Sequence, residues 1–314
     1  MQSPSNADAP VQHWYVLGAG AIGGLFASLL QGAGTPCTLL LRAGDPDLVR
    51  GTSAISLRRG EQLLSFRFDV SASVDSGAIT HLLVCTKAQD IVAAVAGVAH
   101  RLAPGCVVVL LANGLGYQQQ VQTLWPQLDC YPGSTTEGAF REGRRAICHG
   151  GHGSTLIGQS GRSRAPDWFR VWRELPIQCA WSSDIDTVLW RKLAINCAIN
   201  PLTALYRCRN GDLAERPELR ALVAKLCSEV RAIGIAASQA EAVSDLQAQV
   251  MAVIRATANN RSSMLQDVLA GRETEIDYLT GYLLDQGRRH GIEAPGNAAL
   301  LAAVKNVSSV TVPR

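Results

Sequence analysis

A lysine and two asparagines recur every four residues in the segment WRKLAINCAINPLTALY, residues 190–206. If this segment is a helix, Lys192, Asn196 and Asn200 lie on one face, because residues four apart stack on a helix surface. The intervening residues are mostly apolar, which predicts a largely buried helix. Buried polar groups need partners, either other side chains or a ligand. An ammonium can polarise a carbonyl oxygen and then donate a proton, so this face is suited to acid catalysis.

A glycine-rich stretch near the start predicts a dinucleotide site. Residues 16–24, VLGAGAIGG, follow a predicted strand and open a predicted helix, with glycines spaced G-x-G-x-x-G. The first glycine permits a tight turn, the second lets the backbone approach a pyrophosphate, and the third allows close packing of helix on strand. Free N–H groups at the helix N-terminus would face the phosphates. We assign the cofactor phosphates to Gly18, Ala19, Gly20, Ala21, Ile22 and Gly23.

The residue that follows the second predicted strand indicates which dinucleotide is bound. NAD sites usually carry Asp or Glu there, about 20 residues after the glycines. Here Arg42 follows the strand CTLLL, and the nearest carboxylate, Asp45, comes three residues later. A guanidinium can bind a 2′-phosphate in a fork, whereas a carboxylate would repel it. We therefore expect NADP(H) rather than NAD(H), with a solvated strand end as the alternative role of Arg42.

The elements that must position these residues change character near residue 184. Before it, short apolar runs alternate with helical patterns, which predicts a doubly wound α/β fold with a parallel sheet. The predicted strands are 14–18, 37–41, 81–86 and 106–111, the predicted helices are 22–32, 88–102 and 116–125, residues 53–70 read as a hairpin, and residues 138–158 read as an antiparallel meander.

After Asp184 the apolar residues recur at helical spacing throughout, and Pro217 and Pro295 suit helix starts. The predicted helices are 185–205, 217–233, 241–257, 262–270, 275–290 and 297–307. We therefore expect a disordered lead-in (1–12), a Rossmann-type NADP-binding domain (13–183) and an all-helical substrate and catalytic domain (184–314).

Composition excludes several classes of function. The chain has 314 residues, 47% hydrophobic and 18% charged, with a net charge of +3 and no Lys/Arg run, which argues against a nucleic-acid surface. No uninterrupted apolar stretch approaches the ~18 residues of a membrane span. The polar N-terminus is not a signal peptide, and nine cysteines without C-x-x-C suit a reducing cytoplasm. His149 and His152 lie in a glycine-rich stretch without an acidic neighbour, so we expect a loop and no metal site.

With these features together, the chain resembles the ketopantoate reductase (2-dehydropantoate 2-reductase) family over about residues 13–305. The element W-x-K-L-x-x-N-x-x-x-N-P-L-T-A is unbroken from Trp190 to Ala204. The other matching stretches are CTKA (85–88), ANGLG (112–116), NRSSMLQD (260–267) and TEIDYLTG (274–281). The chain departs from the family in its long N-terminal extension and in Glu137.

The resemblance implies the role of each matched residue. The general acid falls on Lys192 and the active-site glutamate, which also lies at the cofactor, on Glu275. The substrate-binding residues would be Asn113, Asn196, Asn200, Asn210, Asn260 and Ser263. Further cofactor contacts fall on Lys87, on Asn113 near the nicotinamide and on the backbone of Ala139. The implied reaction is NADPH-dependent reduction of ketopantoate to (R)-pantoate, towards pantothenate and coenzyme A, by a cytoplasmic monomer or homodimer.

Simpler roles remain open for several of these residues. Lys192 could be a surface lysine, the two helix asparagines could be packing groups, and Lys87 could be a charged strand end. Ser263 could cap a helix, and Glu275 could stabilise a helix N-terminus.

Other functions also remain open. A related reductase could use another branched 2-oxo acid. A non-catalytic NADPH sensor would have lost Lys192 or Glu275, and both are present. An opine-type dehydrogenase would use a histidine as its acid–base group, and the helical part contains only His290.

Overall fold

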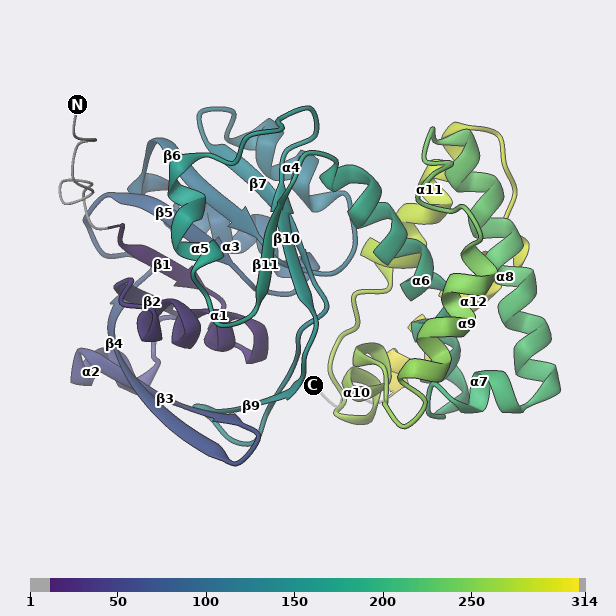
Figure 1. Cartoon of the computed structure of the whole chain (residues 1–314), viewed down its shortest axis with the longest axis horizontal. Helices are drawn as coiled ribbons and strands as arrows, with labels where there is room; N and C mark the ends of the chain where they lie inside the picture. The colour runs from purple at the N-terminus through teal and green to yellow at the C-terminus, as the bar shows by residue number, and fades with distance from the viewer. Residues whose placement is uncertain (1–11, 311–314) are drawn as a thin grey trace, which may run out of the picture. The chain divides into compact units, whose positions relative to one another are not determined.

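The computed structural model describes residues 12–310, so all of the predicted lead-in except Gln12 lies outside the described residues. The chain forms two compact units (Figure 1). The first comprises the residues up to Ala112 together with Gln118–Ile185, and the second comprises Asn113–Tyr117 together with the residues from Asp186 onward. The short segment 113–117 therefore leaves the first unit to join the second.

The first unit is built on one sheet, which has eleven strands within the described part of the chain. Its spatial order is β11-β10-β7-β6-β5-β1-β2-β4-β3-β9-β8. The strands are β1 (Trp14–Leu17), β2 (Cys37–Leu41), β3 (Thr52–Arg59), β4 (Gln62–Ala72), β5 (Ile79–Val84), β6 (Leu102–Leu110), β7 (Asp129–Thr135), β8 (Gly138–Arg141), β9 (Ala146–Gly151), β10 (Ser154–Gly158) and β11 (Gln178–Ser182). From β7 to β4 all neighbours are parallel, as the buried apolar runs predicted.

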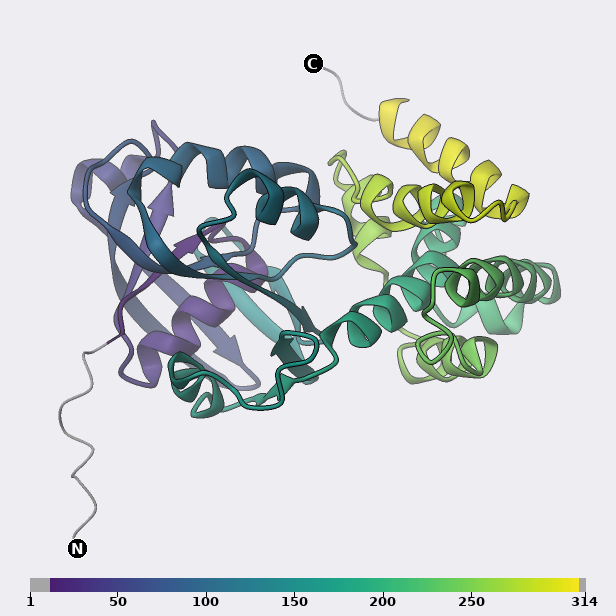
Figure 2. The same ribbon diagram turned by 90° about the horizontal axis from the view of Figure 1, so that it is seen from above.

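The helices of this unit are α1 (Ala21–Gly32), α2 (Pro46–Arg50), α3 (Ile91–Val98), α4 (Tyr117–Leu124) and α5 (Arg170–Arg173), with 3₁₀ turns η1 (Ala88–Asp90), η2 (Ala99–Arg101) and η3 (Asp167–Phe169). The connection from β1 to β2 runs one way across the sheet, and that from β5 to β6 runs the other way. Because such crossovers are right-handed, α1 and α3 lie on opposite faces of the sheet (Figure 2).

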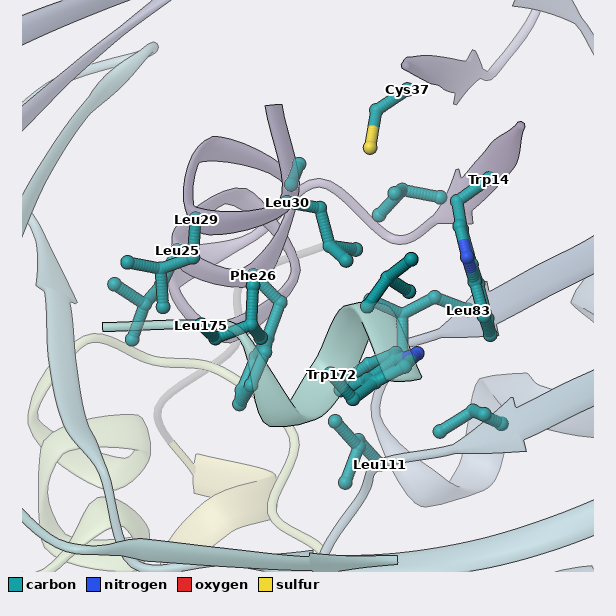
Figure 3. Close-up of a cluster of buried hydrophobic side chains, with 14 of the residues drawn as sticks. Trp14, Leu25, Phe26, Leu29, Leu30, Cys37, Leu83, Leu111, Trp172 and Leu175 are labelled. Atoms are coloured by element: carbon teal, nitrogen blue, oxygen red, sulfur yellow. The ribbon is translucent and has the colours of Figure 1, made fainter. Parts of the chain in front are cut away.

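The core on the α1 face explains why these runs fold as strands. Leu25, Phe26, Leu29 and Leu30 of α1 are buried against alternate strand residues and against Trp172 of α5 (Figure 3). The Trp172 ring lies 5.5 Å from the Phe26 ring and packs edge-on against Trp14 of β1. Intervening strand residues such as Leu82 and Val84 are also buried, which fits a sheet covered on both faces.

The two outer parts of the sheet test the predicted hairpin and meander. The hairpin is present, with β3 antiparallel to β4 and Arg59 opposite Gln62. The meander is wrong in part: β8 and β9 are antiparallel, but β9 pairs in parallel with β3, and β10 pairs with β7 and β11. These partners lie far away in sequence, so periodicity within residues 138–158 could not identify them.

The second unit is helical apart from its loops. Its elements are α6 (Ile185–Tyr206), α7 (Asp212–Glu215), α8 (Pro217–Ala236), α9 (Leu246–Ala256), α10 (Ser263–Leu269), the π-helical turn η4 (Asp277–Gly281), α11 (Tyr282–Arg289) and α12 (Pro295–Val310). Helix α8 contacts α7, α9, α11 and α12, so it packs against several helices of this unit (Figure 1). In the described part of the chain no helix is both long and apolar enough to cross a bilayer.

Candidate active site

The glycine loop joins β1 to α1 with its backbone tightly folded. Gly18 has φ +95°, a conformation that favours glycine, and a Cβ there would lie 2.6 Å from the Thr86 nitrogen. A Cβ on Gly23 would overlap the carbonyl oxygen of Gly18, which holds the helix close to the strand. Gly20, by contrast, has no neighbouring atom within 4 Å of its Cβ position. The loop is therefore closed on its protein side and open at Gly20, where a pyrophosphate could approach the backbone.

A pocket of about 460 Å³ lies beside this loop in the first unit. Its lining includes Gly18 and Ala19 from the loop, Arg42 from the end of β2, and Asp90 and Arg145. The Arg42 side chain is 88% exposed, and its guanidinium lies 4.0 Å from the Asp90 carboxylate. An exposed guanidinium at the rim of a nucleotide-sized pocket is suited to a 2′-phosphate, because both N–H donors of its fork are accessible.

Asp45, the carboxylate nearest to Arg42 in sequence, is held in an ion-pair network. It accepts a hydrogen bond from the backbone N–H of Asp47 at the start of α2. Arg144 and Arg145 both donate hydrogen bonds to the Asp45 carboxylate, and Arg145 also donates one to Asp47. Burial acts to raise the pKa of Asp47, but Ser53 and the two arginines lower it below its usual value. Sequence reasoning missed Arg145, which is 100 residues away from Asp45 and comes from the β8–β9 turn. The carboxylate is thus neutralised by two guanidiniums.

Of the two remaining cofactor candidates of the first unit, one follows a strand of the sheet and the other lies on a strand. Lys87 is the residue before the 3₁₀ turn η1, at the carboxyl end of β5 and two residues after Cys85. Ala139 lies on β8, which contacts α1, and its side chain packs on the same core as Ala19 and Ile22. The fold therefore brings Ala139 to the α1 side of the sheet, where the glycine loop also lies.

The predicted polar stripe lies on α6 of the second unit. This helix runs continuously through Pro201 for 22 residues, so Lys192, Asn196 and Asn200 follow one face over about 12 Å. Asn200 is buried and Asn196 is partly exposed. Leu193, Ala194, Cys197 and Ala198 are buried, so much of the helix surface beside the stripe is enclosed. The three polar groups are consequently placed in an apolar setting, where hydrogen bonds to a ligand are strengthened.

Loss of hydration lowers the pKa of Lys192 to about 8, and the Glu275 carboxylate opposes this shift. The lysine keeps some accessible surface, so a substrate could reach it. At neutral pH most molecules still carry a protonated Lys192, but this lysine loses its proton much more easily than an ordinary lysine does. Desolvation and Glu275 therefore leave Lys192 as an acid suited to proton transfer near neutral pH.

Glu275 is held in place by the segment 113–117. The Asn113 amide donates a hydrogen bond from Nδ2 to Glu275 Oε2 over 3.0 Å, and Glu275 is 9% exposed. Next to it, the Leu115 N–H donates to the Tyr278 carbonyl at 2.9 Å, and a Cβ on Gly114 would overlap that carbonyl. The structure thus brings together Asn113, Lys192 and Glu275, which come from three segments far apart in sequence. The π-helical turn that follows Glu275 was not predicted.

Asn210 and Asn260 lie in two turns that are joined by their backbones. The Asn210 N–H donates to the Asn260 carbonyl at 3.0 Å, and the Gly211 N–H donates to Ala258. The side chain of Asn210 donates to the Thr257 hydroxyl, and its buried Oδ1 has no hydrogen-bond partner among residues 12–310. The Asn260 side chain is exposed. Asn210 therefore has a structural role in addition to any contact with substrate.

Ser263 does not cap the helix that it begins. The cap is Ser262, whose hydroxyl accepts a hydrogen bond from the Leu265 N–H at 3.1 Å and also pairs with Thr203 of α6 at 2.7 Å. Ser263 is exposed at the first position of α10. The alternative role considered for Ser263 thus belongs to its neighbour, and the Ser263 hydroxyl is accessible to a ligand.

Comparison with known proteins places these features in context. The family described as "Ketopantoate reductase PanE/ApbA" matches residues 14–162, and that described as "Ketopantoate reductase PanE/ApbA C terminal" matches residues 184–308. The 2-dehydropantoate 2-reductase of Yersinia pestis is 37% identical over 299 residues, with 94% of each chain covered. That of Vibrio cholerae is 35% identical over 300 residues, covering 93% of this chain and 96% of the relative.

Solved structures share the fold over nearly the whole chain. A probable 2-dehydropantoate 2-reductase from Bacillus subtilis is 27% identical with a TM-score of 0.77, covering 94% of this chain and 100% of that one. A PanE/ApbA family ketopantoate reductase from Ralstonia eutropha JMP134 has a TM-score of 0.83 at 24% identity, covering 96% of this chain and 99% of that one. A D-mandelate dehydrogenase with NADH gives 0.86 at 20% identity over 96% and 99%, a likeness of fold alone.

Proposed function

Since the chain belongs to the ketopantoate reductase family, as its motifs predicted, we propose that it catalyses the NADPH-dependent reduction of ketopantoate to (R)-pantoate. The relatives that share more than a third of its residues carry the name of this reaction. The single observation that supports this proposal most directly is the lowered pKa of Lys192, which interacts with Glu275 and shares a helix face with two carboxamides.

The residues of the first unit fit the cofactor. Gly20 leaves the backbone open to a pyrophosphate, and Arg42 offers an exposed guanidinium to a 2′-phosphate. Asp45, which could otherwise repel that phosphate, is neutralised by Arg144 and Arg145. NADPH bound here would supply the hydride for the C2 carbonyl of the substrate.

The residues of the second unit would provide the proton and hold the substrate. Lys192 polarises the C2 carbonyl through its ammonium and donates a proton to the alkoxide that develops there. Glu275 raises the proton affinity of Lys192 and is itself fixed by Asn113. Ser263 and Asn260 offer exposed donors to the substrate carboxylate, and Asn196 and Asn200 can both donate to and accept from its hydroxyl. Residues 13–183 and 184–314 would thus divide cofactor binding from catalysis.

The test is a comparison of substrates and cofactors with the purified full chain. Loss of NADPH absorbance is followed with ketopantoate and with 2-oxoisovalerate, which lacks the hydroxyl, and NADH replaces NADPH in a parallel series. We expect turnover to be highest with ketopantoate and NADPH. A preference for 2-oxoisovalerate would change the proposed substrate but leave the proposed mechanism intact. Tight NADPH binding without turnover of either acid would refute the proposal that the protein is an enzyme.

We also propose a cytoplasmic location, supported by the fact that all nine cysteines are free thiols. Both a monomer and a homodimer are compatible with the family, since one structural neighbour is titled a dimeric ketopantoate reductase from Staphylococcus aureus. Light scattering on the purified chain distinguishes the two.

A further inference from the structure

A buried carboxylate and two histidines gather in the first unit, in residues that the proposed reaction does not use. Glu137 lies between β7 and β8, His149 lies on β9, and His152 lies between β9 and β10. One potential ligand atom from each of the three lies within 4.8 Å of those of the other two. The acidic partner that sequence reasoning did not find near the histidines is therefore Glu137, brought in by the strand pairing of β8 with β9.

The contact between Glu137 and His149 is fully buried and leaves one ring nitrogen of His149 without a partner. His149 Nε2 lies 2.6 Å from Glu137 Oε2, and the two side chains are 0% and 1% exposed. His149 Nδ1 is buried without a hydrogen-bond partner in the part of the chain that the structure describes. No lysine or arginine among residues 12–310 forms an ion pair with Glu137. A buried carboxylate needs a cation beside it, which either a protonated imidazole or a bound metal ion would supply.

The third residue is placed to complete a cation site. The His152 ring lies 4.8 Å from the His149 ring at 66°, and its side chain is exposed. Glu137 and His152 both line a surface cavity of about 750 Å³, which gives an ion a route to the buried pair. An exposed ring can change its rotamer at little cost, so His152 can turn towards the other two ligands.

The backbone around these residues is already fixed. The Thr136 N–H donates to the Ser154 carbonyl at 2.9 Å, and the Ser154 N–H donates to the Thr136 hydroxyl at 2.9 Å. A Cβ on Gly153 would overlap Thr136, so the two turns are in direct backbone contact. The ligands therefore need only small side-chain adjustments to bind one ion, rather than a rearrangement of the sheet.

We propose that Glu137, His149 and His152 bind a divalent transition-metal ion of the zinc class. Two imidazoles and one carboxylate are a ligand set that zinc accepts, with a fourth position left for water. Ligand atoms on a tetrahedral zinc ion lie about 3.3 Å apart, so the Glu137–His149 pair must separate slightly and His152 must move inward. The ion would neutralise Glu137 and link the two turns.

The experiment uses the full chain, stripped of metal with a chelator and titrated with Zn²⁺ in a calorimeter. We expect one equivalent to bind to the wild type, and at least tenfold weaker binding to His152→Ala. Because His152 is exposed, this variant should fold normally. His290→Ala, which removes another exposed histidine, is the matched control and should bind like the wild type.

A second variant and a spectroscopic readout separate this site from the free thiols. Glu137→Gln keeps a hydrogen-bonding group beside His149 but removes the charge, and should also weaken Zn²⁺ binding at least tenfold. Co²⁺ should give a tetrahedral spectrum without thiolate-to-metal charge transfer. Absence of Zn²⁺ binding, equal affinity in His152→Ala and the wild type, or a thiolate band would each overturn the proposal.

Discussion

The cofactor region of the first unit and the catalytic region of the second are assembled in different ways. The glycine loop and Arg42 come from one strand–helix–strand stretch, so about 25 residues contain most of the groups that we propose to bind phosphate. The residues that we propose for catalysis lie at positions 113, 192 and 275, and hydrogen bonds between distant segments help to bring them together. The proposed cofactor site therefore depends on local backbone geometry, whereas the proposed catalytic site depends on tertiary contacts.

The electrostatics of the two regions differ as well. The Arg42 side chain is 88% exposed, so its charge is well solvated. Lys192 loses hydration, and its pKa falls to about 8. If the proposed roles are correct, removing the exposed charge of Arg42 weakens one ligand contact, whereas removing Lys192 removes the proton donor of the reaction. The following substitutions use that difference.

The largest effect is expected for Lys192→Met, which keeps the length of the side chain and removes the proton donor. General acid catalysis contributes about 10²- to 10⁴-fold, so kcat for ketopantoate reduction should fall within that range. The Kd for NADPH, measured by fluorescence titration, should stay within twofold of the wild type. Lys225→Met removes an exposed lysine from α8 and is the control. An active Lys192→Met enzyme would contradict the assignment of the acid.

Arg42→Ala should have the next largest effect, confined to the cofactor. Charge-assisted hydrogen bonds contribute about 1.5–3 kcal/mol, which corresponds to a rise of about 10- to 150-fold in the KM for NADPH. The KM for NADH should not change, because NADH has no 2′-phosphate. Arg50→Ala, another exposed arginine of the same unit, should leave both values unchanged. An equal loss with both cofactors would mean that Arg42 has a structural role.

The pH dependence tests whether Glu275 controls Lys192. Reduction needs the protonated lysine, so kcat/KM should be constant below pH 8 and fall tenfold per unit above it. Glu275→Gln keeps an acceptor for Asn113 and removes the charge that raises the Lys192 pKa. The fall of kcat/KM with rising pH should therefore begin below pH 8 in this variant. The exposed Glu293→Gln is the control. If kcat/KM of Glu275→Gln still began to fall at pH 8, Glu275 would have no influence on the proton donor.

The same contrast explains how much could be predicted from sequence. The loop from Gly18 to Gly23 and the helices of the second unit follow from spacing and periodicity, which are local properties. The pairing of β10 with β7, the contact of Arg145 with Asp45 and the contact of Glu137 with His149 depend on strand neighbours that spacing does not encode. Resemblance to a family supplied Asn113 and Glu275, because no local pattern relates residues that are 162 positions apart.

The smallest effects should separate two adjacent serines. Ser262 caps α10 and binds Thr203, so Ser262→Ala should lower the free energy of unfolding by about 1 kcal/mol. Ser263 makes no cap, so Ser263→Ala should leave stability unchanged and raise the KM for ketopantoate. Urea denaturation measures the stability of both variants, and steady-state kinetics measures their KM for ketopantoate. Loss of stability in Ser263→Ala, or an unchanged KM, would remove Ser263 from the substrate site, because an exposed hydroxyl contributes to catalysis only through a ligand that it touches.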